Sequence, residues 1–214
     1  PELIPPMSDH ASKKSLEYLT DLGVNVLLET AIEDYKDGKV VLSNGQLIPT
    51  KILIYAAGVA GIAPEGLNKA NWVRSHRLEV DGHCRITPYK DIFAIGDIAA
   101  MKDKDGQALP MLAQPAIQQG KFLAKYFKRQ LPADHPTFSY KDLGTMATIG
   151  KRKAVADLAI GKFHGTFAWL IWLFVHVMGL VGFRNRLSVL FSWSMSYFAA
   201  HKNYRLIIRP TEKL

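Results

Sequence analysis

A strand-like segment that ends in glycine and aspartate constrains the fold of this chain more than any other. Asp91 ends a turn, and residues 92–95 have the β-branched, aromatic and small apolar side chains of a short buried strand. Gly96 then allows close backbone approach, and Asp97 follows it. Ligands of α/β folds bind beyond the carboxyl ends of strands, which places Asp97 to hold the hydroxyl or phosphate-linked groups of a dinucleotide. The alternative is that Asp97 caps a helix, because residues 98–100 are compatible with one.

The start of the chain predicts a helix followed by a strand. Residues 8–22 begin with polar residues and carry leucines at helical spacing, so they predict an N-capped amphipathic helix that ends at Gly23. Residues 24–28 predict a short strand. The apolar face of the predicted helix consists of Ala11, Leu16, Leu19 and Leu22. The chain starts with Pro1 rather than methionine, so we expect a fragment whose sheet begins upstream.

Three strand regions follow. Residues 39–48 predict a hairpin, since Asn-Gly at its centre supplies the positive φ of a two-residue turn. Residues 51–55 predict a buried strand that leads into the small residues 56–61. These small residues permit close approach to a flat or phosphorylated ligand, or they form a tight turn. Residues 78–87 predict a further hairpin. No Gly-x-Gly-x-x-Gly phosphate loop occurs in the sequence.

A glutamine cluster marks the start of the next helix, which is predicted over about residues 115–129. Pro115 suits the first turn, where a missing N–H costs nothing. Gln114, Gln118 and Gln119 lie near that helix start, whose free N–H groups suit an anion or a polarised carbonyl. Solvated glutamines on a surface helix are the alternative.

The last third of the chain predicts strands and then apolar helices. Residues 138–161 look like strands broken by glycines, and the basic run at 151–153 either grips phosphate or forms a solvated turn. Residues 165–183 carry no formal charge, but His176 at their centre and basic residues on both sides argue against a membrane span. Residues 187–199 predict a second, amphipathic helix.

Charge is distributed unevenly along the chain. Residues 1–100 carry 10 Lys and Arg against 13 Asp and Glu, whereas residues 101–214 carry 17 against 6. Residues 151–214 hold 10 basic against 2 acidic residues, interleaved with aromatic side chains, including a basic stretch at 201–209. This composition predicts helices that lie in an anionic membrane interface. Nucleic acid is disfavoured because the aromatics sit in apolar runs, and a buried helical hairpin of a larger assembly is the alternative.

Taken in order, these segments resemble the type II (non-proton-pumping) NADH:quinone oxidoreductases. The resemblance covers nearly all 214 residues, corresponds to the carboxyl-terminal half of such an enzyme, and is most specific at Ala-Gln-Pro-Ala-Ile-Gln-Gln-Gly and in the tail. It implies an α/β fold, α+β within this fragment, that is part of a two-dinucleotide-binding-domain flavoprotein with a C-terminal amphipathic helical membrane anchor. The implied domains are residues 1–70 for NADH, 71–137 for FAD and 138–214 for the C-terminal domain.

The resemblance also implies a function. Such a respiratory-chain enzyme passes a hydride from its substrate NADH to FAD and two electrons to a membrane quinone, with no metal; the single cysteine, Cys84, likewise offers no metal cluster. We expect a peripheral, monotopic protein on the cytoplasmic side of the cell inner membrane, and a homodimer. Because both phosphate loops are absent, the fragment alone is expected to bind FAD weakly and to be inactive. A non-catalytic docking module at the membrane surface, derived from such a flavoprotein, is the alternative.

Site residues follow from the same resemblance. Gly96 and Asp97 match the pair that holds the FAD ribityl and phosphate region. The element against the flavin ring and quinone maps to Ala113, Gln114 and Pro115. The nicotinamide loop maps to Ala57 and Gly58. The quinone contacts map to Gln114, Gln118, Ile149 and His176, of which Gln114 and His176 are the catalytic candidates. His176 either bonds or protonates a quinone oxygen, or it is a buried histidine bonded to backbone.

Overall fold

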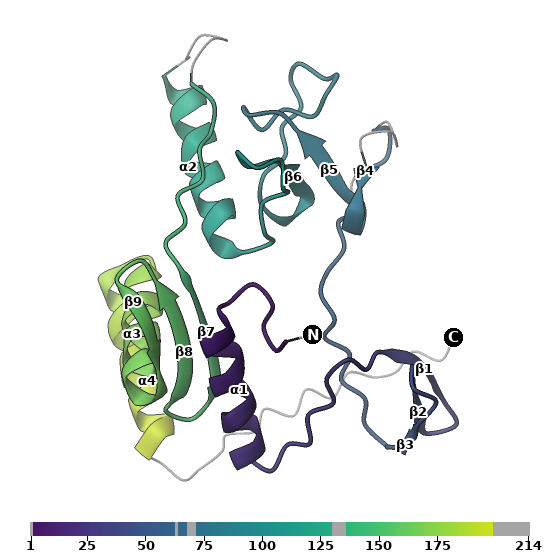
Figure 1. Ribbon diagram of the computed structural model, residues 1–214. Coiled ribbons are helices and arrows are strands. Elements are labelled where there is room, and N and C mark those ends of the chain that lie inside the picture. The colour runs from purple at the N-terminus through teal and green to yellow at the C-terminus, as the bar shows by residue number, and fades with distance from the viewer. Residues whose placement is uncertain (1, 63, 68–71, 130–135, 199–214) are drawn as a thin grey trace, which may run out of the picture. The chain divides into compact units, whose positions relative to one another are not determined.

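The computed structural model describes residues 2–62, 64–67, 72–129 and 136–198 and contains two compact units (Figure 1). One unit joins the start of the chain, Pro1–Glu29, to its end, Gly144–Leu214, and the other spans Thr30–Leu143. The division into three successive domains at residues 70 and 137 stays a prediction.

The unit that joins both ends of the chain is a three-stranded sheet between helices. Its strands β7 (Thr145–Gly150), β8 (Lys153–Leu158) and β9 (Gly161–His164) pair antiparallel in chain order. Figure 1 shows α1 (Asp9–Asp21) on one side of this sheet and α3 (Gly165–Gly179) on the other. The predicted strands within 138–161 are therefore confirmed for β7 and β8, whereas residues 138–143 form no strand.

The central strand β8 is buried on both faces. Val155 packs against Met7 and Ala11 on the α1 side. Ala154 and Ala156 pack against Ala168 of α3 on the other side. A strand covered on both faces has no polar alternation, which is why this stretch of the sequence is a short run of alanine and valine.

Helix α1 confirms the predicted caps but not the predicted face. Ser8 Oγ accepts a hydrogen bond from the Ala11 N–H at 3.4 Å. Gly23 has a φ of +78° and donates to Thr20 O, which closes the helix as expected for a C-terminal glycine. The buried residues are Ala11, Ser12 and Ser15 rather than the leucines, and Leu22 is 53% exposed. Small side chains let α1 approach the sheet closely, so the prediction of a leucine face was wrong.

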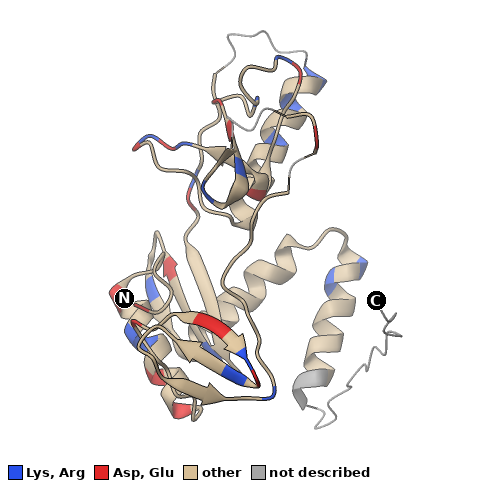
Figure 2. Ribbon diagram, turned by 90° about the vertical axis from the view of Figure 1, so that its right-hand side faces the viewer, with Lys and Arg blue, Asp and Glu red and all other residues tan. Residues whose placement is uncertain are grey.

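Two helices follow the sheet and carry most of the apolar tail. The uncharged stretch 165–183 is not one helix, because α3 ends at Gly179 and α4 (Phe183–Phe198) begins after Gly182, whose φ is +84°. The helix predicted from residue 187 thus starts four residues earlier. Figure 2 shows α3 free of charged residues and α4 with basic residues only near its start. Residues 199 and 201–209, which carry the end of that helix and the basic stretch, lie outside the described residues.

No helix among the described residues combines the length and apolar character needed to cross a membrane. Arg186 helps to set the turn between α3 and α4, since its Nε donates to the Leu180 carbonyl at 2.9 Å.

Gly144 is a position where a side chain would not fit. Its φ is +93°, and a Cβ would collide with the Asp157 carbonyl oxygen and the Leu158 side chain. We expect Gly144→Ala to lower the free energy of unfolding by about 3 kcal/mol, as backbone strain and steric clash add. Gly106→Ala is the matched control, because Gly106 also has positive φ (+76°) but open space around a Cβ. Denaturant unfolding of the full chain measures both, and equal losses would show that no clash exists at Gly144.

The unit Thr30–Leu143 begins with a small antiparallel sheet. Its strands are β1 (Ile32–Lys36), β2 (Lys39–Leu42) and β3 (Leu47–Pro49), paired in chain order. The predicted hairpin β2–β3 is confirmed. Its loop has three residues rather than two, since Leu42 N–H bonds Gln46 O and only Gly45 has positive φ. The extra residue matches the three-residue hairpin loops that end in a left-handed glycine.

Two predicted strands do not form. Residues 24–28 and 51–55 have no ladder partner among the described residues, and Ile52 and Ile54 are 77% and 84% exposed. An apolar, β-branched segment becomes a strand only when a neighbouring strand takes its backbone hydrogen bonds. The strand β1, with all five residues exposed, lacks the apolar alternation that would have predicted it.

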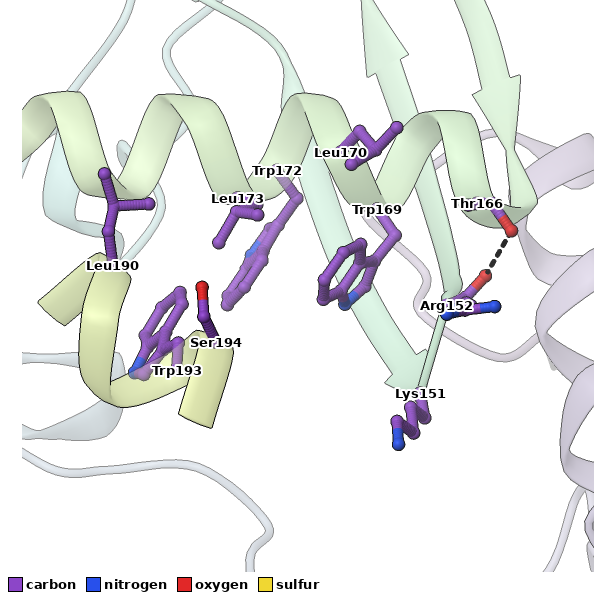
Figure 3. A pocket seen from close by; sticks show the side chains of 10 residues that line it. All are labelled: Lys151, Arg152, Thr166, Trp169, Leu170, Trp172, Leu173, Leu190, Trp193 and Ser194. Atoms are coloured by element: carbon purple, nitrogen blue, oxygen red, sulfur yellow. Dashed lines mark hydrogen bonds between the residues drawn. The ribbon is translucent and has the colours of Figure 1, made fainter. Parts of the chain in front are cut away.

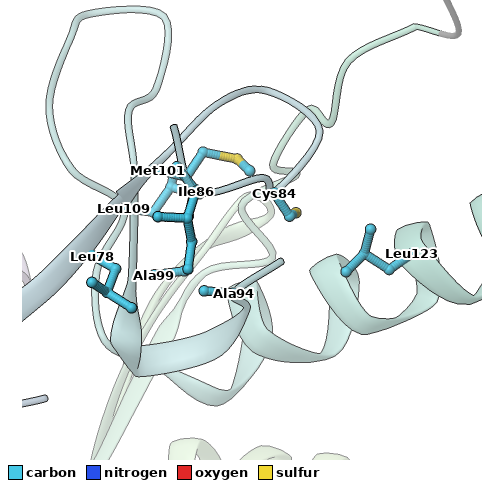
Figure 4. Packing of buried hydrophobic residues seen from close by; sticks show 9 residues of the cluster. Leu78, Cys84, Ile86, Ala94, Ala99, Met101, Leu109 and Leu123 are labelled. Atoms are coloured by element: carbon cyan, nitrogen blue, oxygen red, sulfur yellow. The ribbon is translucent and has the colours of Figure 1, made fainter. Parts of the chain in front are cut away.

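A second sheet supports the main core of this unit. Strand β5 (Arg77–Val80) pairs antiparallel with β4 (Trp72–Val73) and parallel with β6 (Ala99–Met101). The predicted hairpin after β5 is confirmed in short form, as Asp81 N–H donates to Arg85 O and Val80 bridges Ile86. The core, shown in Figure 4, consists of Leu78, Val80, Cys84, Ile86, Ala94, Ala99, Met101, Leu109 and Leu123.

Cys84, the one cysteine of the sequence, lies inside this core with no exposed surface. Burial raises the pKa of its thiol to about 12. The thiol therefore stays protonated and shielded at physiological pH, and Cys84 is no redox nucleophile.

Candidate cofactor and acceptor site

The glycine and aspartate that end the strand-like segment form a tight turn. Phe93 pairs with Arg85 as an isolated bridge, and a single 3₁₀ turn, η3 (Gly96–Ile98), follows. Gly96 has a φ of +74°, and a Cβ on it would contact the Ala116 methyl at 3.4 Å. The chain continues into β6 and not into a helix, so the alternative of Asp97 as a helix cap is wrong. Asp97 is exposed, and its carboxylate makes no hydrogen bond or ion pair within the described residues.

Helix α2 (Ala113–Lys128) fixes this turn through a buried glutamine. The Gly96 N–H donates to Gln119 Oε1 at 2.7 Å, and Gln119 is only 1% exposed. The sequence places Gln119 in the glutamine cluster but does not identify this role. Its spacing of four from the buried Pro115 and Leu123 is the signal that puts it on the inner face of the helix.

A buried arginine, which the sequence reading missed, holds the other side of the turn. Arg77 is 7% exposed, and its guanidinium donates to the carbonyls of Asp97 at 3.0 Å, Ala99 at 2.6 Å and Leu109 at 3.0 Å. Burial lowers the pKa of Arg77, and the Asp97 carboxylate partly opposes that shift. The sequence did offer a signal for this role, since Arg77 is a basic residue at the start of an apolar strand. A guanidinium buried there needs several hydrogen-bond acceptors around it.

Arg77 also lines a cavity of about 510 Å³ between β5, β6 and the 106–111 loop. The basic residues on this cavity are Arg74, Arg77 and Lys102, and Glu79 pairs with Lys102 at 2.6 Å.

The small-residue loop after position 55 makes its close contact at Gly61. A Cβ on Gly61 would collide with the His76 carbonyl oxygen and the Ile98 side chain, and its N–H donates to Ser75 O at 2.9 Å. This loop therefore reaches η3. Ala57 and Gly58 are exposed, and Gly58 has a φ of +105° with open space around it. Gly61 thus makes the close contact of this loop with the described protein, and the approach of the loop to a ligand stays a prediction.

The three glutamines at the start of α2 have three different surroundings. The helix begins two residues before the predicted start, so its first three positions are Ala113, Gln114 and Pro115, and no side chain caps them. Gln118 pairs with backbone, as its Nε2 donates to Lys141 O at 2.8 Å and its Oε1 accepts from Lys141 N–H at 3.0 Å. Gln114 is half-buried and makes no side-chain hydrogen bond within the described part of the chain. Gln114 is thus the glutamine whose amide is available to a ligand.

His176 and Ile149 belong to the other compact unit. The Nδ1–H of His176 donates to the Trp172 carbonyl at 2.8 Å, and the ring stacks on Trp172 with centroids 4.3 Å apart. The backbone bond expected in the alternative reading is present, but the ring is exposed rather than buried. With Nδ1 as donor, Nε2 is the nitrogen left to accept or pass a proton. Ile149 is half-buried at a β-bulge, where the β7–β8 register shifts between Thr148 and Gly150.

The chemistry of the Gly96–Asp97 turn fits one side of a dinucleotide flavin. An open carboxylate suits ribityl hydroxyl groups, and the uncapped start of α2 offers N–H groups to a carbonyl or an anion. The phosphate loop that would complete such a site is absent from the sequence. No group of three or more metal-ligating side chains occurs among the described residues.

Two family models match the chain. Residues 1–120 match the pyridine nucleotide-disulphide oxidoreductase model, and residues 143–201 match the NDH2 C-terminal domain. Type II NADH:quinone oxidoreductase Ndh of Mycobacterium tuberculosis is 30% identical over 94% of this chain and 45% of its own length. The internal alternative NAD(P)H-ubiquinone oxidoreductase A1 of Arabidopsis thaliana is 28% identical over 92% of this chain and 42% of its own length. The chain thus spans less than half the length of these relatives.

A solved structure agrees with the fold. NDH2 from Plasmodium falciparum in complex with NADH superposes with a TM-score of 0.82 at 18% identity, covering 96% of this chain and 58% of that one. The flavoprotein fold implied by the resemblance is confirmed. This chain belongs to the pyridine nucleotide-disulphide oxidoreductase family and carries an NDH2 C-terminal domain.

Proposed function

We propose that this chain is the carboxyl-terminal part of an FAD-dependent NADH:quinone oxidoreductase that does not pump protons. The observation that carries the proposal is the meeting of the Gly96–Asp97 turn with the start of α2, next to an unengaged Gln114, in a chain matched by both family models. The names of the relatives support the reaction class.

The Gly96–Asp97 turn and the first residues of helix α2 have distinct parts in holding the flavin. Asp97 accepts hydrogen bonds from ribityl hydroxyls, while Gly96 keeps the backbone close enough for them. Ala113 is small enough to leave room against the flavin ring, and Pro115, buried in the first turn, fixes the start of the helix. When bound, FAD takes a hydride from NADH and passes two electrons on. The loop of Ala57 and Gly58 covers the nicotinamide side.

Quinone reduction needs two protons as well as two electrons. In the unit Thr30–Leu143, the Gln114 amide is the donor that we assign to a quinone oxygen. In the other unit, Nε2 of His176 is the nitrogen that can take up a proton and release it. Gln118, held to the Lys141 backbone, supports the wall beside Gln114. Ile149, in the other unit, is the apolar residue that the resemblance assigns to the quinone.

The exposed faces of α3 and α4 support attachment to a membrane from one side. Phe167, Phe174, Phe183 and Phe191 are each at least 60% exposed, and residues 165–198 include Arg184 and Arg186 but no acid. Such helices lie with their apolar faces in the acyl boundary and their cations among headgroups. We therefore place the protein peripherally on the cytoplasmic side of the inner membrane, with homodimers formed through the same unit.

Gln114→Ala tests the acceptor assignment on the product of the complete gene. We expect kcat/KM for quinone to fall about tenfold, the worth of one lost hydrogen bond in a closed site, while NADH oxidation by ferricyanide stays unchanged. Gln46→Ala, an exposed glutamine in the β2–β3 loop, is the control. Quinone reduction equal to wild type would refute the role of Gln114. A wild type that binds membranes but oxidises no NADH would instead favour a non-catalytic docking module.

A further inference from the structure

Each compact unit contains a large cavity. The cavity beside α3 and α4 has a volume of about 690 Å³, and Figure 3 shows the indoles of Trp169, Trp172 and Trp193 projecting into it. The helices around it already have a place in the proposed function. The cavity of about 510 Å³ in the unit Thr30–Leu143 has none, although the buried cation Arg77 lines it.

The guanidinium of Arg77 has an amino group to spare. Nε and Nη2 make the three bonds to backbone carbonyls, whereas Nη1 makes no hydrogen bond within the described part of the chain. The fully buried side-chain nitrogens that lack a partner in that part are Trp72 Nε1 and Arg85 Nε, so Nη1 is not sealed inside the protein. Because Arg77 is 7% exposed and lines the cavity, Nη1 meets open space there. Two N–H donors of a buried cation therefore remain for a ligand.

A second arginine at the cavity also lacks a partner. Arg74 lines the cavity, is exposed, and makes no hydrogen bond or ion pair with the described residues. It begins the 3₁₀ turn η2 (Arg74–His76), in which Ser75 and His76 have φ of +61° and +51°. Positive φ at two successive residues other than glycine is uncommon. Through this tight turn, Arg74, Ser75 and Arg77 all line the same cavity.

The charges that line the cavity are unbalanced. Among the described residues the lining holds three basic side chains, Arg74, Arg77 and Lys102, against one acid, a net charge of +2. That acid, Glu79, pairs with Lys102 at 2.6 Å, which leaves the two arginines. The Asp97 carboxylate acts on Arg77 electrostatically but does not line the cavity. A phosphate monoester matches this balance better than a carboxylate does, since it carries a charge of about −1.5 to −2 at pH 7. Arginine also suits phosphate oxygens geometrically.

The size and walls of the cavity indicate the rest of the ligand. A volume of about 510 Å³ lies in the range of small-molecule sites, about 300–1,000 Å³, and exceeds what inorganic phosphate fills. Ser75 and Gln107 supply polar side chains, and the strand β6 and the 106–111 loop supply apolar ones. No aromatic side chain of the described residues lines the cavity, so a nucleotide base would find no ring on which to stack.

We propose that this cavity binds a phosphate monoester of a small, non-aromatic metabolite. Its phosphate lies at Arg74 and at Nη1 of Arg77, and its body lies along β6 and the 106–111 loop. The site goes beyond the proposed function and does not rest on it, because no flavin, nicotinamide or quinone contact is assigned to this cavity.

Calorimetric titration of the flavin-loaded product of the complete gene with glycerol 3-phosphate tests the site. We expect saturable binding at one site with a Kd below about 1 mM. Glycerol should show no binding, and inorganic phosphate should bind more weakly because it lacks the body. Arg74→Gln should weaken binding about tenfold, the lower end of what a hydrogen bond to a charged group contributes. Arg74→Lys keeps the charge and should retain most of the affinity.

Two further variants separate the cavity from general charge effects. Lys104→Gln removes a cation from an exposed position of the same unit that does not line the cavity, and it should leave binding unchanged. Ala108→Phe fills part of the cavity without changing the charge, and it should weaken binding. Ala108 and Arg74 are both exposed, so the fold should tolerate each substitution.

Four results would overturn the proposal. The first two are the absence of saturable binding and equal affinity of the wild-type and Arg74→Gln proteins for glycerol 3-phosphate. The third is inorganic phosphate that binds as tightly as the ester, which would leave the body without a role. The fourth is adenosine monophosphate that binds more tightly than glycerol 3-phosphate and loses affinity in Arg74→Gln, which would make the ligand a nucleotide. None of these measurements depends on NADH oxidation, so they fail independently of the proposed function.

Discussion

Asp97→Ala is expected to strip most of the FAD from the product of the complete gene. The Asp97 carboxylate is exposed and accepts no hydrogen bond from the described protein. Its oxygens are therefore available to accept hydrogen bonds from flavin hydroxyls. Losing hydrogen bonds to a charged group costs about 1.5–3 kcal/mol each, or roughly tenfold to a hundredfold in affinity. Flavin absorbance per mole of purified protein measures the loss.

The geometry separates this loss from a folding defect. Arg77 binds the backbone carbonyl of Asp97 and not its side chain, so the alanine variant keeps that anchor. The Gly96 N–H bond to Gln119 is likewise untouched. Asp91→Ala removes an exposed acid from the same segment and should leave the flavin in place. A fully flavinated Asp97→Ala protein would show that the turn does not hold the cofactor.

Segments with local signals were predicted well from the sequence. Helix α1 is defined by Ser8 at one end and Gly23 at the other, and the β2–β3 hairpin by Gly45. Each of these residues acts on backbone within a few positions of itself. The same holds for Gly96, where the sequence indicates close backbone approach and a Cβ would lie 3.4 Å from the Ala116 methyl.

Features that depend on distant partners were not predictable in this way. Residues 24–28 and 51–55 have strand-like side chains, yet strand formation is decided by a neighbour elsewhere in the chain. Gln119 and Arg77 acquire their roles from backbone groups 20 or more positions away. The glutamine cluster was recognised as a group, but only the fold distinguishes the buried Gln119 from the unengaged Gln114.

Arg77→Met should strongly destabilise the unit Thr30–Leu143. Three carbonyls, those of Asp97, Ala99 and Leu109, would lose a charged donor, and methionine of similar length supplies none. With about 1.5 kcal/mol for each of the three bonds to a charged group, the expected loss of unfolding free energy is about 4.5 kcal/mol. Denaturant unfolding of the full chain, followed by tryptophan fluorescence, measures it.

Arg74→Met is the matched control for this loss. Arg74 lines the same cavity but is exposed, so its removal should cost less than about 0.5 kcal/mol. Arg77→Lys tests the geometry, because a single ammonium cannot reach three carbonyls as the guanidinium fork does, and we expect an intermediate loss. Since one of those carbonyls belongs to Asp97, the Arg77 variants of the complete gene product should also lose flavin in proportion to their destabilisation. Equal stability of the Arg77→Met and Arg74→Met proteins would mean that the turn holds its shape without Arg77.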